Sequence, residues 1–193
     1  VTGDGWILTN SFTPNKPTSD IKEGYRVITS KNKVKEINKA IQDEKRNVTF
    51  LHLKEAKDLP AVKLADPEKI NNGEIVIATN KGERTLVTSI TEKTSPKNLV
   101  RSSDRMKEEL ILSHQLNNYY NNDSFLFNLD EELVGLQTSG SGNIPSIAQF
   151  HPSISSLLKF KEIKTPTLGI HYIDLSEMVM SEKYPERGVL LYS

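Results

Sequence analysis

The chain has 193 residues, with 25 basic residues against 25 acidic ones, so its net charge is close to zero. A neutral chain argues against a basic nucleic-acid-binding protein and gives no electrostatic reason for attraction to anionic lipids. The absence of cysteine excludes a disulfide framework, a thiolate metal site and a cysteine nucleophile. No apolar stretch approaches the roughly 18 residues that span a bilayer.

Short β-type segments recur from Trp6 to Thr138 and are separated by turn residues. They are 6–9, 25–29, 34–41, 48–53, 74–79, 84–91, 109–113, 125–129 and 132–138. Many short strands at even spacing are typical of an all-β sandwich or barrel. The last two segments predict a hairpin across Asp130 and Glu131.

One later segment has helical periodicity. Ile154, Leu157 and Leu158 fall on one helical face, and Pro152 suits the first turn of such a helix. A Ser- and Gly-rich stretch at 138–142 precedes it and predicts a surface loop. After Pro166 three further β-type runs follow, at 167–173, 175–180 and 189–192.

No local motif carries chemistry. The four histidines, at 52, 114, 151 and 171, form no zinc-type pair at helical spacing. The chain also lacks a Gly-rich phosphate loop and the Gly-x-Ser-x-Gly nucleophile elbow. We therefore expect no cofactor and no metal.

Several strings nevertheless occur in a telling order. They are GWILTN (5–10), EAKDLPAVKLAD (55–66), NGEIVIA (72–78), LVTS (86–89), FLFNLDEELVGLQT (125–138) and TLGI (167–170). Together they resemble the HtrA-type (DegP-like) serine proteases of the chymotrypsin fold. In that family the first string leads to the catalytic histidine, the fifth is the hairpin after the nucleophile loop, and the last opens a PDZ domain.

The resemblance implies an all-β fold of two six-stranded antiparallel β-barrels (chymotrypsin/trypsin-like), a C-terminal helix and a truncated PDZ start. Residues 1–146 would form the protease-type double barrel without its N-terminal strand or strands. Residues 147–166 would be the helix and linker, and 167–193 a partial PDZ domain. Because Val1 opens directly on a turn and a strand, we expect the chain to begin inside this fold.

The resemblance also places the catalytic triad, residue by residue. The histidine position after Thr-Asn-x is Phe12, and the aspartate position at the head of a strand is Asn47. Counting back from the hairpin puts Asn122 at the nucleophile and Tyr120 at the glycine of the oxyanion hole. An alternative aspartate, Asp58, falls in the middle segment and is assigned to a linker.

All these positions have lost the required chemistry. Phe12 cannot accept a proton, and the Asn122 carboxamide is not a nucleophile. Tyr120 stands where the family uses a flexible glycine, and the carboxylate of Asp123 would repel an oxyanion. The inherited site is therefore expected to be catalytically inactive.

A rebuilt site is the open alternative. Ser113 and Ser124 lie near the former nucleophile loop, and His114 occupies a position where the family carries aspartate. A new Ser–His pair is conceivable because triads are defined by geometry and not by chain order. The alternative is a structural role for His114, which would cap or line the remnant of the specificity pocket.

The sequence therefore favours a non-catalytic HtrA-like protease homologue that acts as a peptide-binding or assembly module. By resemblance, Thr167, Leu168, Gly169 and Ile170 would contact peptide or unfolded protein segments. The family also implies a homo-oligomer, a trimer, in an extracytoplasmic or membrane-tethered setting. The rivals are an active trypsin-like endopeptidase of protein quality control, and a decaying sequence that folds poorly.

Overall fold

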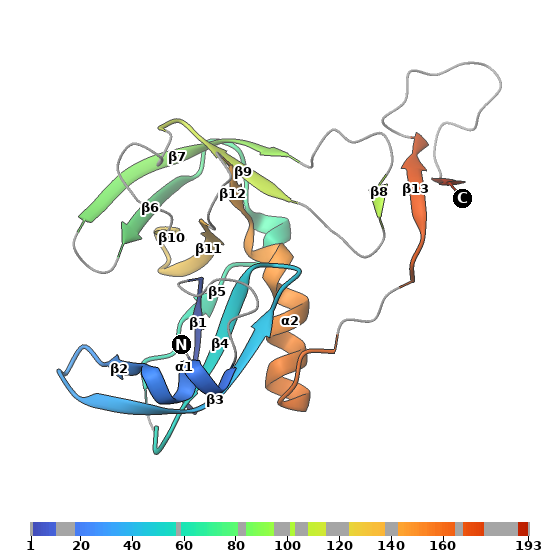
Figure 1. Cartoon of the computed structure of the whole chain (residues 1–193). Coiled ribbons are helices and arrows are strands. Elements are labelled where there is room, and N and C mark those ends of the chain that lie inside the picture. Colours follow the sequence, from blue (N-terminus) through green and yellow to red (C-terminus); the bar gives the residue numbers. More distant parts are fainter. Residues whose placement is uncertain are drawn as a thin grey trace, which may run out of the picture.

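The computed structural model describes residues 2–10, 18–56, 59–80, 84–94, 101–102, 108–114, 124–137, 143–164, 168–175 and 189–192. The described strands form three sheets, and one long helix stands beside them (Figure 1). This confirms a mostly β fold with a helix toward the C-terminal side. No helix of the described residues is long and apolar enough to cross a membrane.

The N-terminal sheet has the order β1-β4-β3-β2, with antiparallel neighbours throughout. Its strands are β1 (Trp6–Thr9), β2 (Arg26–Ile28), β3 (Val34–Asp43) and β4 (Val48–Leu53). A short helix that the sequence did not predict, α1 (Thr18–Gly24), covers one face and buries Ile21.

Strand β4 is buried on both faces, although its sequence alternates like a half-exposed strand. Val48 and Phe50 face the main core, whereas Leu51 and Leu53 pack in a second cluster with Ile21 of α1. The unpredicted helix therefore explains why both faces of this strand are covered.

The second sheet has the order β12-β9-β7-β6-β10-β11-β5. Its strands are β5 (Lys63–Leu64), β6 (Ile75–Asn80), β7 (Arg84–Thr94), β9 (Glu109–Leu112), β10 (Ser124–Phe127), β11 (Glu132–Leu136) and β12 (Ile144–Pro145). A single turn of 3₁₀ helix, Pro67–Lys69, follows β5. All neighbours are antiparallel except β5, which runs parallel to β11.

This sheet curls until β11 lies against the chain just after β12, where Gly135 forms an antiparallel bridge with Ser146. Gly135 makes the approach possible. A Cβ there would meet Pro145 O at 3.0 Å, Ile144 Cγ2 at 3.2 Å and Leu110 Cδ1 at 3.3 Å. A side chain at this position would therefore hold the two ends of the sheet apart.

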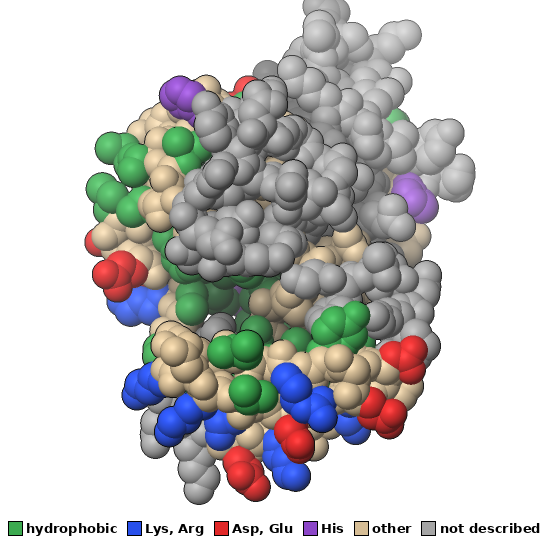
Figure 2. Space-filling model, turned by 60° about the vertical axis from the view of Figure 1, so that its left-hand side comes forward, with side chains coloured by type: hydrophobic (Ala, Val, Ile, Leu, Met, Phe, Trp, Pro, Cys, Tyr) green, Lys and Arg blue, Asp and Glu red, His purple; other side chains and the backbone are tan. Residues whose placement is uncertain are grey.

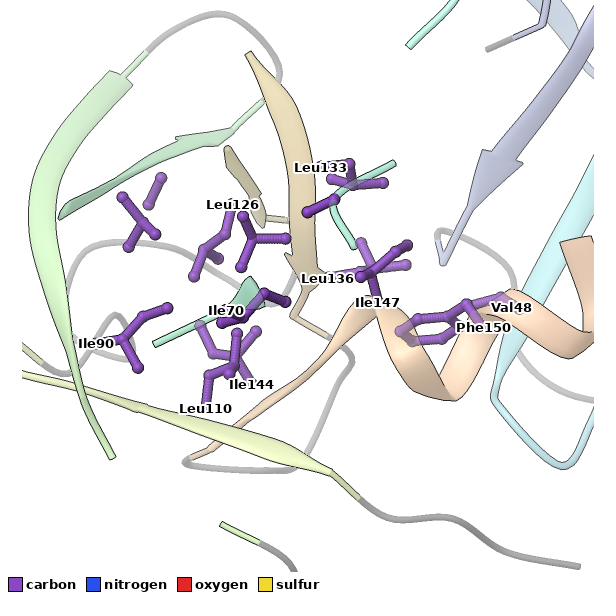
Figure 3. Packing of buried hydrophobic residues seen from close by; sticks show 14 of the residues in the cluster. Val48, Ile70, Ile90, Leu110, Leu126, Leu133, Leu136, Ile144, Ile147 and Phe150 are labelled. Atoms are coloured by element: carbon purple, nitrogen blue, oxygen red, sulfur yellow. The ribbon is translucent and has the colours of Figure 1, made fainter. Parts of the chain in front are cut away.

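The interior of the curl is the main hydrophobic core. Ile90, Leu110 and Leu126 are fully buried and point into it from three different strands (Figure 3). Phe150, on the long helix, lies beside Val48 of β4 and belongs to the same cluster. One continuous core therefore joins the curled sheet, the helix and the N-terminal sheet.

The predicted hairpin across Asp130 and Glu131 is confirmed. Strands β10 and β11 pair on either side of it, and Glu131 adopts a positive φ of 62°. The Asn128 side-chain oxygen accepts the N–H groups of Asp130 at 3.1 Å and Glu132 at 2.8 Å. Such Asx bonding is a common way to hold a tight turn.

The long helix, α2, spans Ile147–Phe160, so it starts five residues before the proline that was expected to open it. Ser146 caps it by accepting the Ala148 N–H at 3.3 Å. Pro152 lies inside the helix and is exposed. The cap and the burial of Ile147 and Phe150 outweigh the bond that the proline removes.

The third sheet, β14-β13-β8, consists of β8 (Arg101–Ser102), β13 (His171–Asp174) and β14 (Val189–Tyr192). Strand β13 begins later than the predicted 167–173. The predicted loop at 138–142, and most of the predicted strand at 175–180, lie outside the described residues.

The described strands do not by themselves make two complete six-stranded barrels, since the N-terminal sheet contains only β1 to β4. What the structure shows is one curled sheet and a smaller four-stranded sheet that share a core.

Candidate functional site

Of the three positions that resemble a catalytic triad, Asn47 is described. Phe12 and Asn122 lie outside the described residues, as do Tyr120 and the alternative aspartate Asp58. Strand β1, which precedes Phe12, and strand β10, which follows Asn122, are described. Their ends show where the two segments that carry Phe12 and Asn122 are attached.

The ends of β1 and β4 lie side by side. Thr9 at the end of β1 pairs with Thr49 at the start of β4, and Asn47 ends the turn that precedes β4. Asn47 is half-buried and adopts a left-handed φ of 53°, a conformation that asparagine tolerates better than most residues. Its place is therefore fixed beside the end of β1.

The start of β10 and the end of β11 meet the same end of β1. The Asn10 side-chain amide donates to the Gln137 carbonyl oxygen at 2.5 Å, across 127 residues of chain. The Gln137 N–H in turn donates to the Ser124 carbonyl oxygen at 2.9 Å. The segment that contains Phe12 begins after Asn10, and the segment that contains Asn122 ends before Ser124. Both segments therefore join described residues that lie close together.

The turn that carries Asn47 is fastened to α2 by a buried polar cluster, which comprises Asp43, Arg46, Gln149 and Ser153. The Asp43 carboxylate accepts from Arg46 Nη1 at 3.0 Å and from the Ser153 hydroxyl at 2.5 Å. Arg46 Nε donates to the Gln149 carbonyl. Helix α2 therefore positions the Asn47 turn.

The described residues at these strand ends include no histidine, and their one serine is buried. Ser124 is fully buried, and its hydroxyl has no hydrogen-bond partner. His52, the one described histidine of this sheet, faces Trp6 at the far end of β1 with ring centroids 4.8 Å apart.

The serine and histidine proposed as a rebuilt pair lie elsewhere. Ser113 Oγ is 3.4 Å from His114 Nδ1, and both residues are exposed. The same hydroxyl bonds Thr88 Oγ1 at 3.0 Å and Ser89 Oγ at 3.2 Å. Ser113 is thus held at the Ser89 level of β7.

Ser124, by contrast, pairs with Asn80 of β6, and Asn80 pairs in turn with Arg84 at the start of β7. Ser89 and Arg84 are separated by about 16 Å of strand at roughly 3.3 Å per residue. The structure therefore does not bring Ser124 and His114 together. A second neighbouring pair, Ser155 Oγ and His151 Nδ1 at 3.3 Å, lies on the exposed face of α2.

The structure adds a cavity of about 120 Å³ that the sequence did not reveal. It lies between β1, β4, β5, β11 and α2. Its lining comprises Thr2, Trp6, Ile7, Leu8, Phe50, Val62, Leu64, Leu133, Ile154, Leu157 and Leu158. None of the described residues that line it is charged. The sequence signal for it is the run of consecutive apolar residues in β1, because a strand with one buried face needs an apolar residue only at every second position.

A space-filling view shows hydrophobic side chains gathered in the hollow between the upper and lower parts of the molecule (Figure 2). Charged side chains of both signs follow the lower part. One exposed pair, Asp4 and Lys161 at 3.2 Å, ties the start of the chain to the end of α2. The hydroxyl of Thr2, which donates to Asp4, and then the nearby Lys161 hold the Asp4 pKa below its ordinary value.

The predicted peptide-contacting residues precede β13. Thr167 lies outside the described residues, and Leu168, Gly169 and Ile170 are exposed. Gly169 has a φ of 65°, and a Cβ added there would meet no atom within 4 Å. No group of three or more His, Asp or Glu side chains among the described residues could hold a metal ion.

Comparison with known proteins leaves the family open. No protein-family model matches the chain, and no curated protein matches it either.

Proposed function

We propose that this chain is a catalytically inactive HtrA-like serine protease homologue that works as a peptide-binding or assembly module. The observation that carries the proposal is the meeting of strand ends around Asn10, Asn47, Ser124 and Gln137. These are the ends from which the resemblance expects histidine, aspartate and serine to converge. A scaffold that gathers these segments while the sequence supplies Phe12, Asn47 and Asn122 is what an inactive relative requires.

The sheets support the same proposal. The four-stranded sheet that contains β4 and the curled sheet closed near Gly135 are compatible with two barrels of the chymotrypsin type. The hairpin β10–β11 follows the former nucleophile loop, as the family pattern requires. The two complete barrels and the PDZ start at 167–193 remain part of the proposal.

Loss of the triad need not unfold such a scaffold. The core of Ile90, Leu110, Leu126 and their neighbours is independent of the triad positions. Function lives in sites that a fold carries, so the fold can persist after the chemistry is lost. We propose that peptide or unfolded protein segments are the partners, in a trimeric, extracytoplasmic or membrane-tethered assembly.

The rival is an active endopeptidase. Its geometric support among the described residues named for a rebuilt pair is the Ser113–His114 contact of 3.4 Å. These two residues are adjacent in the chain and exposed, and Ser113 Oγ is shared with Thr88 and Ser89. A triad needs a base that is oriented by a third group and a water-excluding oxyanion site, and neither is present around this pair among the described residues.

A fluorophosphonate probe and a casein digest test the proposal together. We expect no covalent labelling and no casein turnover, with a trypsin sample as the positive control. Labelling accompanied by turnover, abolished by Ser113→Ala or Ser124→Ala, would refute the proposal in favour of the rival. A cooperative thermal transition is expected as well, whereas a decaying sequence with no real core would give none.

A further inference from the structure

The β2–β3 hairpin concentrates positive charge in a chain that is neutral as a whole. Residues 25–35 contain Arg26, Lys31, Lys33 and Lys35 and no acidic residue. Every residue of the hairpin is described, and the hairpin projects from the side of the N-terminal sheet (Figure 1). The balance of 25 basic against 25 acidic residues in the chain therefore conceals a local excess of positive charge on this projection.

Most of this charge has no carboxylate beside it. Lys31 and Lys33 are exposed at the turn, and no described carboxylate pairs with either. Arg26 Nη1 donates to three backbone carbonyl oxygens at the end of α1, at 2.8 to 3.3 Å. Glu36, the first acidic residue after the turn, is offset by Lys54 at 3.6 Å. The hairpin therefore presents a net positive charge to the solvent.

Two large apolar side chains lie next to these lysines. Ile28 and Val34 are directly opposite each other in the hairpin, so their side chains share one face. They are 69% and 63% exposed. The Thr29 N–H donates to the Lys33 carbonyl oxygen at 2.9 Å and closes the turn immediately beyond the pair. The end of the hairpin thus combines a fixed apolar pair with lysines that lack a carboxylate partner.

This combination fits the surface of an anionic bilayer better than it fits a soluble polyanion. A negatively charged lipid surface attracts Lys and Arg, and the boundary between headgroups and acyl chains accepts aliphatic side chains. A soluble polyanion that binds the lysines alone leaves Ile28 and Val34 in water, which is unfavourable for apolar surface. No hairpin residue lines the cavity beside β1, so the apolar pair is presented on a projection and not in a groove.

We infer that the β2–β3 hairpin docks the protein on membranes rich in anionic phospholipid. Ile28 and Val34 enter the headgroup region, while Lys31 and Lys33 bind lipid phosphates around them. The contact is peripheral and reversible, because one apolar pair and a few basic residues make a weak anchor. Such docking does not depend on whether the cleft is catalytic, and it adds a contact surface to the proposed function.

Co-sedimentation of the full chain with lipid vesicles tests this docking. The probes are vesicles of phosphatidylcholine alone and vesicles of phosphatidylcholine mixed with an equal amount of phosphatidylglycerol. We expect saturable binding to the anionic vesicles only. That binding should be lost between about 0.1 and 1 M salt, because the Debye length falls from about 10 to 3 Å. No binding to the anionic vesicles, or equal binding to both kinds, would overturn the inference.

Two pairs of charge variants locate the docking surface. Lys31→Gln with Lys33→Gln should weaken binding about thirtyfold, because each basic residue near an anionic surface contributes about fivefold. The control, Lys63→Gln with Lys69→Gln, removes two exposed lysines from another part of the fold and should change binding less than about threefold. Equal effects of the two pairs would show that net charge, and not the hairpin, determines binding, which contradicts the inference.

The apolar pair is tested against positions of matched exposure. Ile28→Ser with Val34→Ser should weaken vesicle binding about tenfold. Val87→Ser with Leu129→Ser, at positions that are 62% and 67% exposed, should change it less than about twofold. Similar effects of both pairs would overturn the inference.

Polyglutamate serves as the soluble polyanion. Binding of polyglutamate by a protein that ignores anionic vesicles would assign the hairpin to acidic protein segments and refute lipid docking. Fluorophosphonate labelling of the same samples reports on the proposed function separately.

Discussion

The buried cluster around Asp43 gives the sharpest stability prediction, because it fastens the Asn47 turn to α2. Arg46 is its only cationic member. Replacing it in Arg46→Met keeps most of the aliphatic packing but removes the 3.0 Å ion pair and the bond to the Gln149 carbonyl. The Asp43 carboxylate then stays buried with the Ser153 hydroxyl as its remaining side-chain donor.

The expected loss follows from burial. The Asp43 and Arg46 side chains are 4% and 13% exposed, so solvent screens their interaction only weakly. Removing one partner of a buried pair costs about 3–5 kcal/mol. Because Ser153 still donates to the carboxylate, we expect the lower end, about 3 kcal/mol. For a chain of this size that lowers the Tm by about 6–12 °C.

The measurement is urea unfolding followed by Trp6 fluorescence and far-UV circular dichroism. The matched control is Lys54→Met, which removes a 3.6 Å pair with Glu36 whose side chains are 60% and 59% exposed. That variant should lose less than about 1 kcal/mol. Equal losses for the two variants would refute the conclusion that the Asp43 cluster anchors the turn.

Three further predictions concern the fold. Gly135→Ala should lower the free energy of unfolding in urea by about 1–3 kcal/mol, because its Cβ would meet the Pro145 carbonyl oxygen at 3.0 Å. The control Gly24→Ala, which has open space around it, should change that free energy by less than about 0.5 kcal/mol. Equal effects of the two variants would contradict the close approach of β11 and β12. Leu126→Ala should lower the free energy of unfolding by about 2–5 kcal/mol, because Leu126 is fully buried. Val87→Ala, at an exposed position of β7, should change it little. If Val87→Ala were the more destabilising of the two, the curled sheet would not enclose the core. Asp4→Asn should lower the Tm near neutral pH. The folded protein lowers the pKa of Asp4, so the charged carboxylate stabilises the fold at any pH above 3.8, the ordinary pKa of aspartate. That difference should shrink as the pH falls through the lower pKa of the folded protein, and a difference that persists at pH 2 would exclude the charge as its cause.

Strand positions were predictable because turn residues and apolar alternation are local signals. The β10–β11 hairpin is the clearest case, since Asn128 organises its turn from within the same few residues. Helix α1 was not predictable from periodicity because it buries a single residue, Ile21, and depends on the strand beneath it. The start of α2 was missed for a related reason: Pro152 suggested a helix start, while burial of Ile147 and Phe150 determined the actual one.

The candidate site was only partly accessible to sequence reasoning. The resemblance named Phe12, Asn47 and Asn122, but the meeting of their flanking strands depends on pairings such as Asn10 with Gln137, 127 residues apart. The cavity beside β1 also depends on tertiary packing, because its lining comes from five separate elements. Sequence patterns report what each strand buries, but not the space left between strands and helix.

The most direct test of the central claim uses the absence of cysteine in the chain. Phe12→Cys combined with Asn122→Cys gives a clean background for a short bifunctional maleimide, and intact mass reports cross-linking within one chain. We predict rapid cross-linking of this pair, and little for Phe12→Cys with Val87→Cys on β7. If the first pair reacts no faster than the second, the two triad-equivalent positions do not converge, and the account of an inactive protease scaffold is wrong.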